Sequence, residues 1–181
     1  LEVGYNTYPS NFKFKYRHPR VAASLDAMGD VLAAPDAPPN GLLQYASMLQ
    51  HYKGQDAVSG ILDRLAVMGT TDLRFYQMAV LRAMRGRRWA EVAPLCEEAL
   101  RHYPGNAHFV TTLSWIYQTL GHPDKIEPLL RDAYRINPRA RVVVLALAQI
   151  EREAGRLDEA IALYEQSINL FSRPERPAQL A

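Results

Sequence analysis

The residues whose side chains could take part in catalysis or bind a metal are few, and their spacing matches no catalytic or metal-binding pattern. The five histidines are His18, His51, His102, His108 and His122. They show neither the i, i+4 spacing nor the cysteine partners that zinc sites use. Glycines occur singly, so the sequence has no phosphate-binding glycine loop. We therefore predict a protein that is not an enzyme, with no catalytic residue, no metal and no cofactor.

The single cysteine and the acidic residues have structural explanations. Cys96 falls where a predicted helix packs inward, so we interpret it as a buried thiol rather than a nucleophile. Glu97, Glu98, Asp158 and Glu159 lie on predicted helices, where we expect them to face solvent. No apolar run reaches the roughly 18 residues that a membrane-spanning helix needs. With 181 residues, 48% of them hydrophobic, the chain can form one globular domain or one short repeat array.

A repeat with a period of 34 residues runs through the second half of the sequence. Three equivalent sets are Leu95, Leu129 and Leu163; Ala99, Ala133 and Ser167; and Leu100, Tyr134 and Ile168. Pro104 and Pro138 are also one period apart, and each follows a helix-like run, as proline does after a helix C-terminus. Each period therefore predicts two helices joined as a hairpin.

Two helices per 34 residues with these residue types resemble the tetratricopeptide repeat. In residues 107–140 the family's pattern is carried by Val110, Leu113, Ser114, Tyr117, Ile126, Leu130, Ala133 and Pro138, with Gly121 in the turn. Units 73–106 and 141–174 match at fewer places, and unit 39–72 is divergent, with Thr70 where proline is usual. The resemblance implies an all-α solenoid of helical hairpins, wound as a right-handed superhelix. It is specific for fold and says little about function.

The expected organisation along the chain follows from this register. The segments are an extended basic and aromatic arm (1–20), an N-terminal helix with a proline-rich linker (21–38), four hairpins (39–72, 73–106, 107–140 and 141–174) and a C-terminal tail (175–181). Each hairpin buries one apolar stripe internally and leaves another exposed until the next hairpin stacks on it. Small residues such as Ala99, Ala133 and Ala160 are expected where two helix backbones approach closely.

The resemblance also implies where a partner would bind. In such arrays the first helix of each hairpin lines a concave groove, and set places of each unit point into it. In this chain they include Arg74, Gln77, Met78, Leu81, His108, Thr111, Thr112, Trp115, Gln149 and Arg152. These mixed groups surround one tryptophan, as in a peptide-binding surface with a single dominant anchor. The alternative is that Trp115 packs between hairpins or under the chain's own tail.

The N-terminal arm fits no part of the repeat. It is basic, because residues 3–25 contain Lys13, Lys15, Arg17 and Arg20 and no acid. Its aromatic residues alternate with the lysines, which is the period of an extended strand with one apolar face. The arm residues we expect to bind a partner are Tyr8, Phe12, Phe14 and Tyr16. They would do so, for instance, by adding a strand to the partner's sheet; the alternative is a lid on the array itself.

Arginines cluster in residues 82–89 and 131–141, at predicted hairpin turns and helix C-termini. Cations are favourable there because of the helix dipole. These patches lack the interleaved aromatic residues of a single-stranded nucleic-acid platform. The expected partners are therefore proteins and not nucleic acid.

These features together predict a non-catalytic scaffold or adaptor in a multiprotein assembly. Similar arrays serve in bacterial envelope assembly, in secretion and pilus machinery and in polysaccharide export. This favours a periplasmic or envelope-associated place over a cytoplasmic one, although the sequence does not fix the compartment. The alternatives are a cytoplasmic chaperone for secreted proteins, which would be expected to be acidic, and a regulatory region of a larger enzyme, since Leu1 stands where an initiator Met would be.

Overall fold

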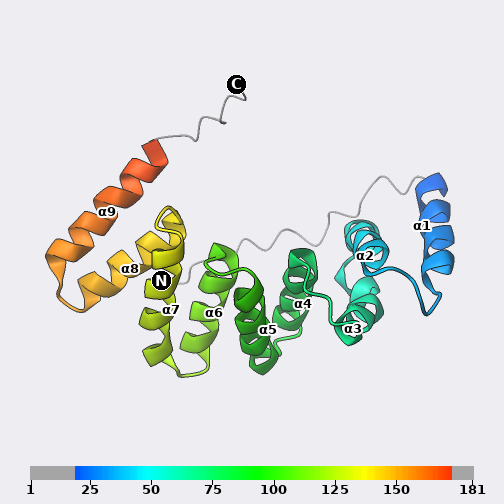
Figure 1. The fold of residues 1–181 in the computed structure, drawn as a ribbon, viewed down its shortest axis with the longest axis horizontal. Coiled ribbons are helices and arrows are strands. Elements are labelled where there is room, and N and C mark those ends of the chain that lie inside the picture. Colours follow the sequence, from blue (N-terminus) through cyan, green and yellow to red (C-terminus); the bar gives the residue numbers. More distant parts are fainter. Residues whose placement is uncertain (1–18, 173–181) are drawn as a thin grey trace. The chain divides into compact units, whose positions relative to one another are not determined.

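The described part of the chain is built from helices alone. The computed structural model describes residues 19–172, and every regular element in that range is helical (Figure 1). The α-helices are α1 (Pro19–Leu32), α2 (Pro39–Lys53), α3 (Ser59–Val67), α4 (Leu73–Arg85), α5 (Trp89–His102), α6 (Ala107–Thr119), α7 (Ile126–Ile136), α8 (Arg141–Glu153) and α9 (Leu157–Ser172). Two short 3-10 helices, η1 (Gln55–Val58) and η2 (Pro123–Lys125), precede α3 and α7. The predicted all-α fold of sequential helical hairpins is confirmed.

Several helix ends follow from local chemistry. Helices α1 and α2 both begin at a proline, whose missing N–H would have no partner in the first turn. For this reason α1 begins at Pro19, inside the segment 1–20 that we predicted to be extended. At the start of α6 the Asn106 side chain accepts hydrogen bonds from the backbone N–H groups of His108 and Phe109. This asparagine is the N-cap that holds the α5–α6 turn.

The chain divides into two compact units, Leu1–Phe75 and Tyr76–Ala181, and the boundary falls within α4. In the first unit, the apolar faces of α1, α2 and α3 form the core, with Leu25 of α1 and Leu43 of α2 almost completely buried. The Lys53 ammonium of α2 binds the Asp26 carboxylate of α1 at 2.9 Å. Arg64 of α3 donates to the backbone carbonyl of Leu32 at 2.6 Å. The first helix is thus attached to the α2–α3 hairpin.

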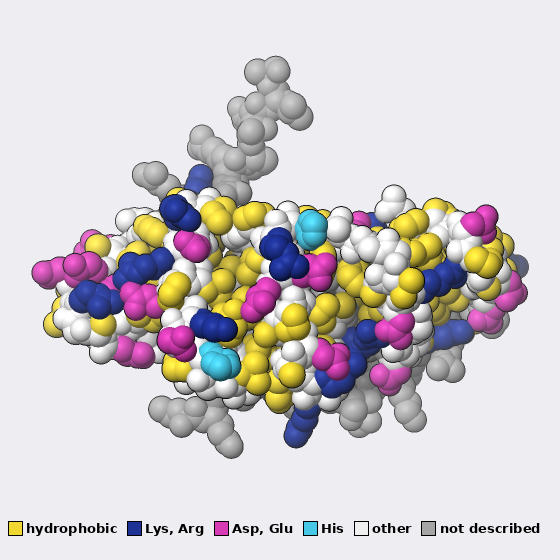
Figure 2. All heavy atoms as spheres, turned by 60° about the horizontal axis from the view of Figure 1, so that its bottom comes forward, with side chains coloured by type: hydrophobic (Ala, Val, Ile, Leu, Met, Phe, Trp, Pro, Cys, Tyr) yellow, Lys and Arg dark blue, Asp and Glu magenta, His cyan; other side chains and the backbone are white. Residues whose placement is uncertain are grey.

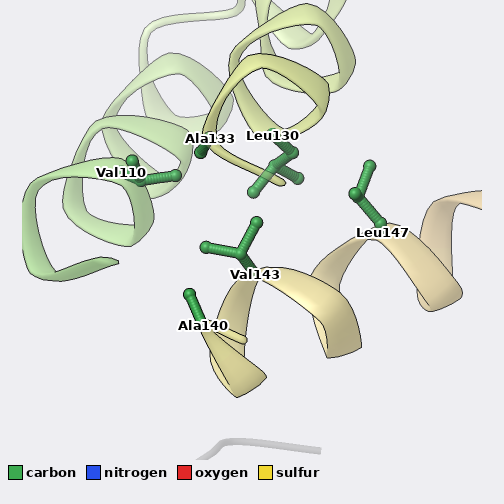
Figure 3. Close-up of a cluster of buried hydrophobic side chains, with 6 residues drawn as sticks. All are labelled: Val110, Leu130, Ala133, Ala140, Val143 and Leu147. Atoms are coloured by element: carbon green, nitrogen blue, oxygen red, sulfur yellow. The ribbon is translucent and has the colours of Figure 1, made fainter. Parts of the chain in front are cut away.

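In the second unit each helix packs on the next, from α5 to α9. The core between α6, α7 and α8 contains Val110, Leu130, Ala133, Ala140, Val143 and Leu147. Figure 3 shows Leu130 of α7 and Val143 of α8 pointing toward each other at the centre of this cluster. Ala99 and Ala133, one repeat period apart, are both buried, which is where the repeat requires small side chains. Neighbouring hairpins therefore share one continuous core within this unit.

Candidate partner-binding surface

The two tryptophans of the chain lie together. Trp115 on α6 contacts Trp89 at the start of α5 edge to face, with ring centroids 5.1 Å apart and an interplanar angle of 79°. Trp115 nevertheless leaves 38% of its surface exposed. Edge-to-face packing holds the indole in place. The surface therefore presents a large aromatic group that is both fixed and accessible.

The other predicted residues of α6, His108, Thr111 and Thr112, lie one and two turns before Trp115 in the helix. His108 is exposed, and Thr111 and Thr112 are half-buried. The Thr111 hydroxyl donates to the backbone carbonyl of Ala107, 2.9 Å away, one turn earlier in the same helix. Its oxygen therefore remains available as an acceptor, while its proton is already used.

The predicted residues of α4 divide into exposed and buried ones. Gln77 is exposed and Leu81 is half-buried, but only 5% of Met78 is accessible. Met78 was predicted to face a partner; instead it belongs to the packed interior, because it lies on the buried face of α4 with Ala79. Arg74 precedes the boundary between the two units, and its guanidinium is 3.0 Å from the Asp72 carboxylate. This ion pair, together with a backbone hydrogen bond, lowers the pKa of Asp72.

On α8, Gln149 and Arg152 share an acidic neighbour. The Gln149 amide donates to Glu153 at 3.0 Å, and the Arg152 guanidinium lies 3.9 Å from the same oxygen. All three side chains are exposed. Because α6 and α8 contact each other, this polar group and Trp115 are presented by adjacent helices of one unit. The predicted arm residues Tyr8, Phe12, Phe14 and Tyr16 lie outside the described residues.

Two glutamates that we expected to be purely solvated have tyrosine partners. The Tyr76 hydroxyl of α4 donates to Glu98 at 3.1 Å, and the Tyr117 hydroxyl of α6 donates to Glu97 at 2.8 Å. Burial, and then the adjacent carboxylate, raises the pKa of each tyrosine to about 12. Adjacent glutamates of α5 thus tie that helix to the helix before it and to the helix after it. Tyrosine is part of the repeat pattern, but its hydroxyl partner is 20 or 22 residues away and has no local signature.

A buried carboxylate was also missed by the sequence analysis. Glu151 of α8 is almost completely buried, and it binds Arg131 of α7 at 2.5 Å and Arg156 of the α8–α9 turn. Arg131 also binds Glu127, one turn earlier in α7, at 2.7 Å. Hydrogen bonding to Arg156 and Arg131 lowers the pKa of Glu151 despite its burial. We name these four residues the Glu151 cluster; its contacts join α7, α8 and the start of α9.

Cys96 is fully buried as expected, and burial raises the pKa of its thiol to about 12, which leaves it protonated and unreactive. Across residues 19–172, no three His, Cys, Asp or Glu side chains are grouped so that they could hold a metal ion. None of the described helices combines the length and the apolarity needed to cross a membrane.

An array of sequentially packed helical hairpins defines the tetratricopeptide-repeat class of fold. Solved structures support this at the level of fold. A crystal structure of MamA, a tetratricopeptide-repeat protein, matches with a TM-score of 0.66 at 16% identity, over 85% of this chain and 90% of that one. A second MamA structure matches with a TM-score of 0.64 at 15% identity, over 88% and 90% of the two chains.

MamA residues 41 to the end from Desulfovibrio magneticus RS-1 also match, with a TM-score of 0.64 at 12% identity, over 86% of this chain and 88% of that one. No family profile and no curated protein sequence matches the chain. The resemblance to the tetratricopeptide repeat predicted from the sequence is thus confirmed as a common fold.

Proposed function

We propose that this chain is a non-catalytic scaffold that binds a peptide segment of another protein at Trp115, within a bacterial envelope, secretion, pilus or polysaccharide-export assembly. The observation that carries the proposal is the Trp89–Trp115 pair, whose outer ring is fixed by its neighbour and still exposed. Large aromatic residues of this kind contribute most to protein–protein affinity, because they bury a large area at little cost in side-chain entropy.

The rest of the proposed groove is polar and carries few acids. Its exposed groups are amide, imidazole and guanidinium side chains of Gln77, His108, Gln149 and Arg152, with Glu153 as the nearby carboxylate. Such groups donate hydrogen bonds to backbone carbonyls and carboxylates of an extended peptide. We therefore expect the bound segment to supply an apolar side chain for Trp115 and acceptor groups on either side of it.

The test uses the fact that both tryptophans of the chain are in this pair, so tryptophan fluorescence, excited selectively over that of the tyrosines, reports on this surface. Peptides selected by phage display on the full chain would be titrated while the emission wavelength is followed. Trp115→Ala should weaken their binding by about 2 kcal/mol, which is roughly 30-fold in Kd. Binding to this variant is measured by the anisotropy of a labelled peptide.

A matched control is Tyr52→Ala, because Tyr52 is an aromatic residue of similar exposure, 36%, on α2. It should leave Kd unchanged. Circular dichroism of both variants checks that helicity is retained. Equal affinity of Trp115→Ala and the wild type for every selected peptide would show that Trp115 has only a packing role.

The arm provides a second, independent part of the proposal. We expect deletion of residues 1–18, which end directly before α1, to leave the melting temperature unchanged and to abolish entry into the native complex. Affinity of the intact chain should fall as salt is raised, because the arm contributes the charges of Lys13, Lys15 and Arg17. A deletion variant that melts much lower yet still co-purifies with the same partners would instead identify the arm as a lid.

A further inference from the structure

Helix α9, the last helix of the described residues, exposes a continuous apolar face. Leu157, Ile161 and Ile168 are 59%, 55% and 64% exposed, and Tyr164 between them is half-buried. Their spacings of four, three and four residues place all four on one side of the helix. The same spacing is the apolar repeat by which two helices pack along their length.

A hollow runs beside this face. Leu145 of α8 and Tyr164, Ser167 and Ile168 of α9 line a cavity of about 320 Å³, with Arg141 at its edge. Val142, in the first turn of α8, is 50% exposed. We name the surface formed by Val142, Leu145, Leu157, Ile161, Tyr164 and Ile168 the terminal face. It presents aliphatic and aromatic groups from both helices of the last hairpin.

The internal repeat shows what kind of element covers such a face. One period before Tyr164 is Leu130, which is buried under Val143 and Leu147 of the following helix, α8 (Figure 3). Two periods before it is Cys96 on α5, which packs against α6 and is also fully buried. At both internal positions the cover is the first helix of the next hairpin. The fitting occupant beside Tyr164 is therefore another helix, with aliphatic residues spaced like Val143 and Leu147. One period before Leu157 and Ile161 are Pro123 and Glu127, which the next helix does not bury, so these two apolar side chains extend the surface on α9 alone.

Charge restricts the occupant further. The charged residues of α9 are Asp158, Glu159 and Glu165, all acidic. Asp158 and Glu165 lie three and four residues from Ile161, so both border the terminal face along one edge. A second copy docked antiparallel through the same face would bring these acids against their own counterparts, which is unfavourable. A helix with Lys or Arg along that edge would instead be attracted.

We propose that the terminal face binds an amphipathic helix of a partner protein that carries aliphatic residues at i and i+4 and basic residues along the edge facing Asp158 and Glu165. The α9 residues of the terminal face lie on a different helix from Trp115, whereas its Val142 and Leu145 lie on α8, seven and four residues before Gln149 of the proposed groove. The terminal face takes a helix and the groove around Trp115 takes an extended segment, so the chain could join two proteins.

The probes are two labelled synthetic peptides based on residues 139–154. Every exposed polar position is Lys in the first peptide and Glu in the second. The second carries the same apolar residues, so it controls for non-specific hydrophobic binding. Fluorescence anisotropy against the full-length chain should show saturable binding of the Lys peptide, at least tenfold tighter than that of the Glu peptide. Raising the salt should reduce this difference.

Four variants test the location. Leu157→Ser with Ile161→Ser should weaken the Lys peptide at least tenfold, while Asp158→Lys with Glu165→Lys should reverse the preference between the two peptides. Val67→Ser is the matched control, because Val67 is an exposed aliphatic residue of α3, and it should change nothing. Trp115→Ala should also leave this binding unchanged, which separates the terminal face from the surface of the proposed function. All substituted positions are exposed or at the surface, and thermal melts verify folding.

Equal binding of both peptides, or binding that is indifferent to the Leu157 and Ile161 substitutions, would overturn the proposal. So would sedimentation showing that the wild type self-associates and that the same two substitutions make it monomeric, since the terminal face would then belong to a second copy.

Discussion

At the scale of single residues, the structure separates side chains that stabilise the fold from those that can contact a partner. Trp115 and Met78 were predicted to have the same role, but one is exposed and the other is packed inside. Glu97 and Glu98 were predicted to be only solvated, yet each accepts a hydrogen bond from a tyrosine on a neighbouring helix. Burial and hydrogen-bond partners therefore distinguish residues that the repeat pattern treats as equivalent.

The Glu151 cluster leads to a prediction about acid stability. Glu151→Gln keeps the shape of the side chain but removes the charge that Arg131 and Arg156 bind, so we expect a loss of about 1–2 kcal/mol near neutral pH. The loss is moderate because both arginines are partly exposed and stay hydrated. Urea unfolding followed by circular dichroism measures it, with Glu159→Gln as a control for the change in net charge.

The pH dependence of this effect has a definite sign. The pKa of Glu151 in the folded chain lies below its ordinary value of 4.5, so the stability it contributes is present above that value. It is lost as the pH falls through the folded pKa, when the carboxylate becomes protonated. The difference between wild type and Glu151→Gln should therefore shrink below pH 4.5. A difference that is constant from pH 7 to pH 3 would contradict a charged interaction.

At the scale of the elements, close packing between helices depends on the turns that connect them. Gly105, in the α5–α6 turn, has a φ of +73°, a conformation that favours glycine. A Cβ atom at this position would lie 2.8 Å from the Ile136 side chain at the end of α7. The turn that connects two hairpins thus touches the end of the second hairpin, which explains why a glycine follows Pro104.

Gly105→Ala should cost more than the same change in a turn without neighbours. We expect a loss of about 2–3 kcal/mol from backbone strain and the contact with Ile136 together. Gly121→Ala is the matched control: its φ is +78° and nothing lies within 4 Å, so only the strain of about 1 kcal/mol applies. Urea midpoints measure both, and Ile136→Ala should reduce the excess cost. Equal losses at the two glycines would show that the close approach has no energetic importance.

At the scale of the whole molecule, the chain consists of two compact units, and the hairpins of the second share one core. Figure 2 shows basic and acidic side chains interspersed on the visible face, with hydrophobic groups exposed between them. On this face the charges of the two signs are mixed, without the concentrated positive charge typical of a nucleic-acid-binding surface. The boundaries of the four repeat units stay a prediction from the sequence: 39–72, 73–106, 107–140 and 141–174.

A shared core predicts that damage at one helix crossing spreads through the unit. Ala133 lies among Val110, Leu130 and Val143, where two helix backbones approach closely. Ala133→Phe should therefore overpack the crossing and cost about 1–3 kcal/mol. Hydrogen exchange should show reduced protection in α5 and α9 as well as in α7, because each hairpin depends on its neighbours.

The control for this experiment is Ala162→Phe, because Ala162 is exposed on α9. It should leave the exchange of α5 and α7 unchanged. Protection lost only around α7 in the Ala133 variant would mean that the hairpins of this unit are energetically independent.

The sequence by itself determined the features that depend on local periodicity. The spacing of apolar residues, the 34-residue repeat and the prolines placed the helical hairpins, because a helix forms from contacts three and four residues apart. Small residues at Ala99 and Ala133 were predictable for the same reason, since the repeat fixes which positions lie at a crossing.

Only the tertiary structure decided which side chains meet across helices. Arg131 and Glu151 are 20 residues apart, Tyr76 and Glu98 are 22 apart, and Trp89 packs on Trp115 from a different helix. The partial exposure of Tyr164 in α9 is likewise decided by tertiary structure, because the equivalent residues Leu130 and Cys96, one and two periods earlier, are buried. Whether a stripe becomes core or binding surface depends on what packs against it, and no local pattern contains that information.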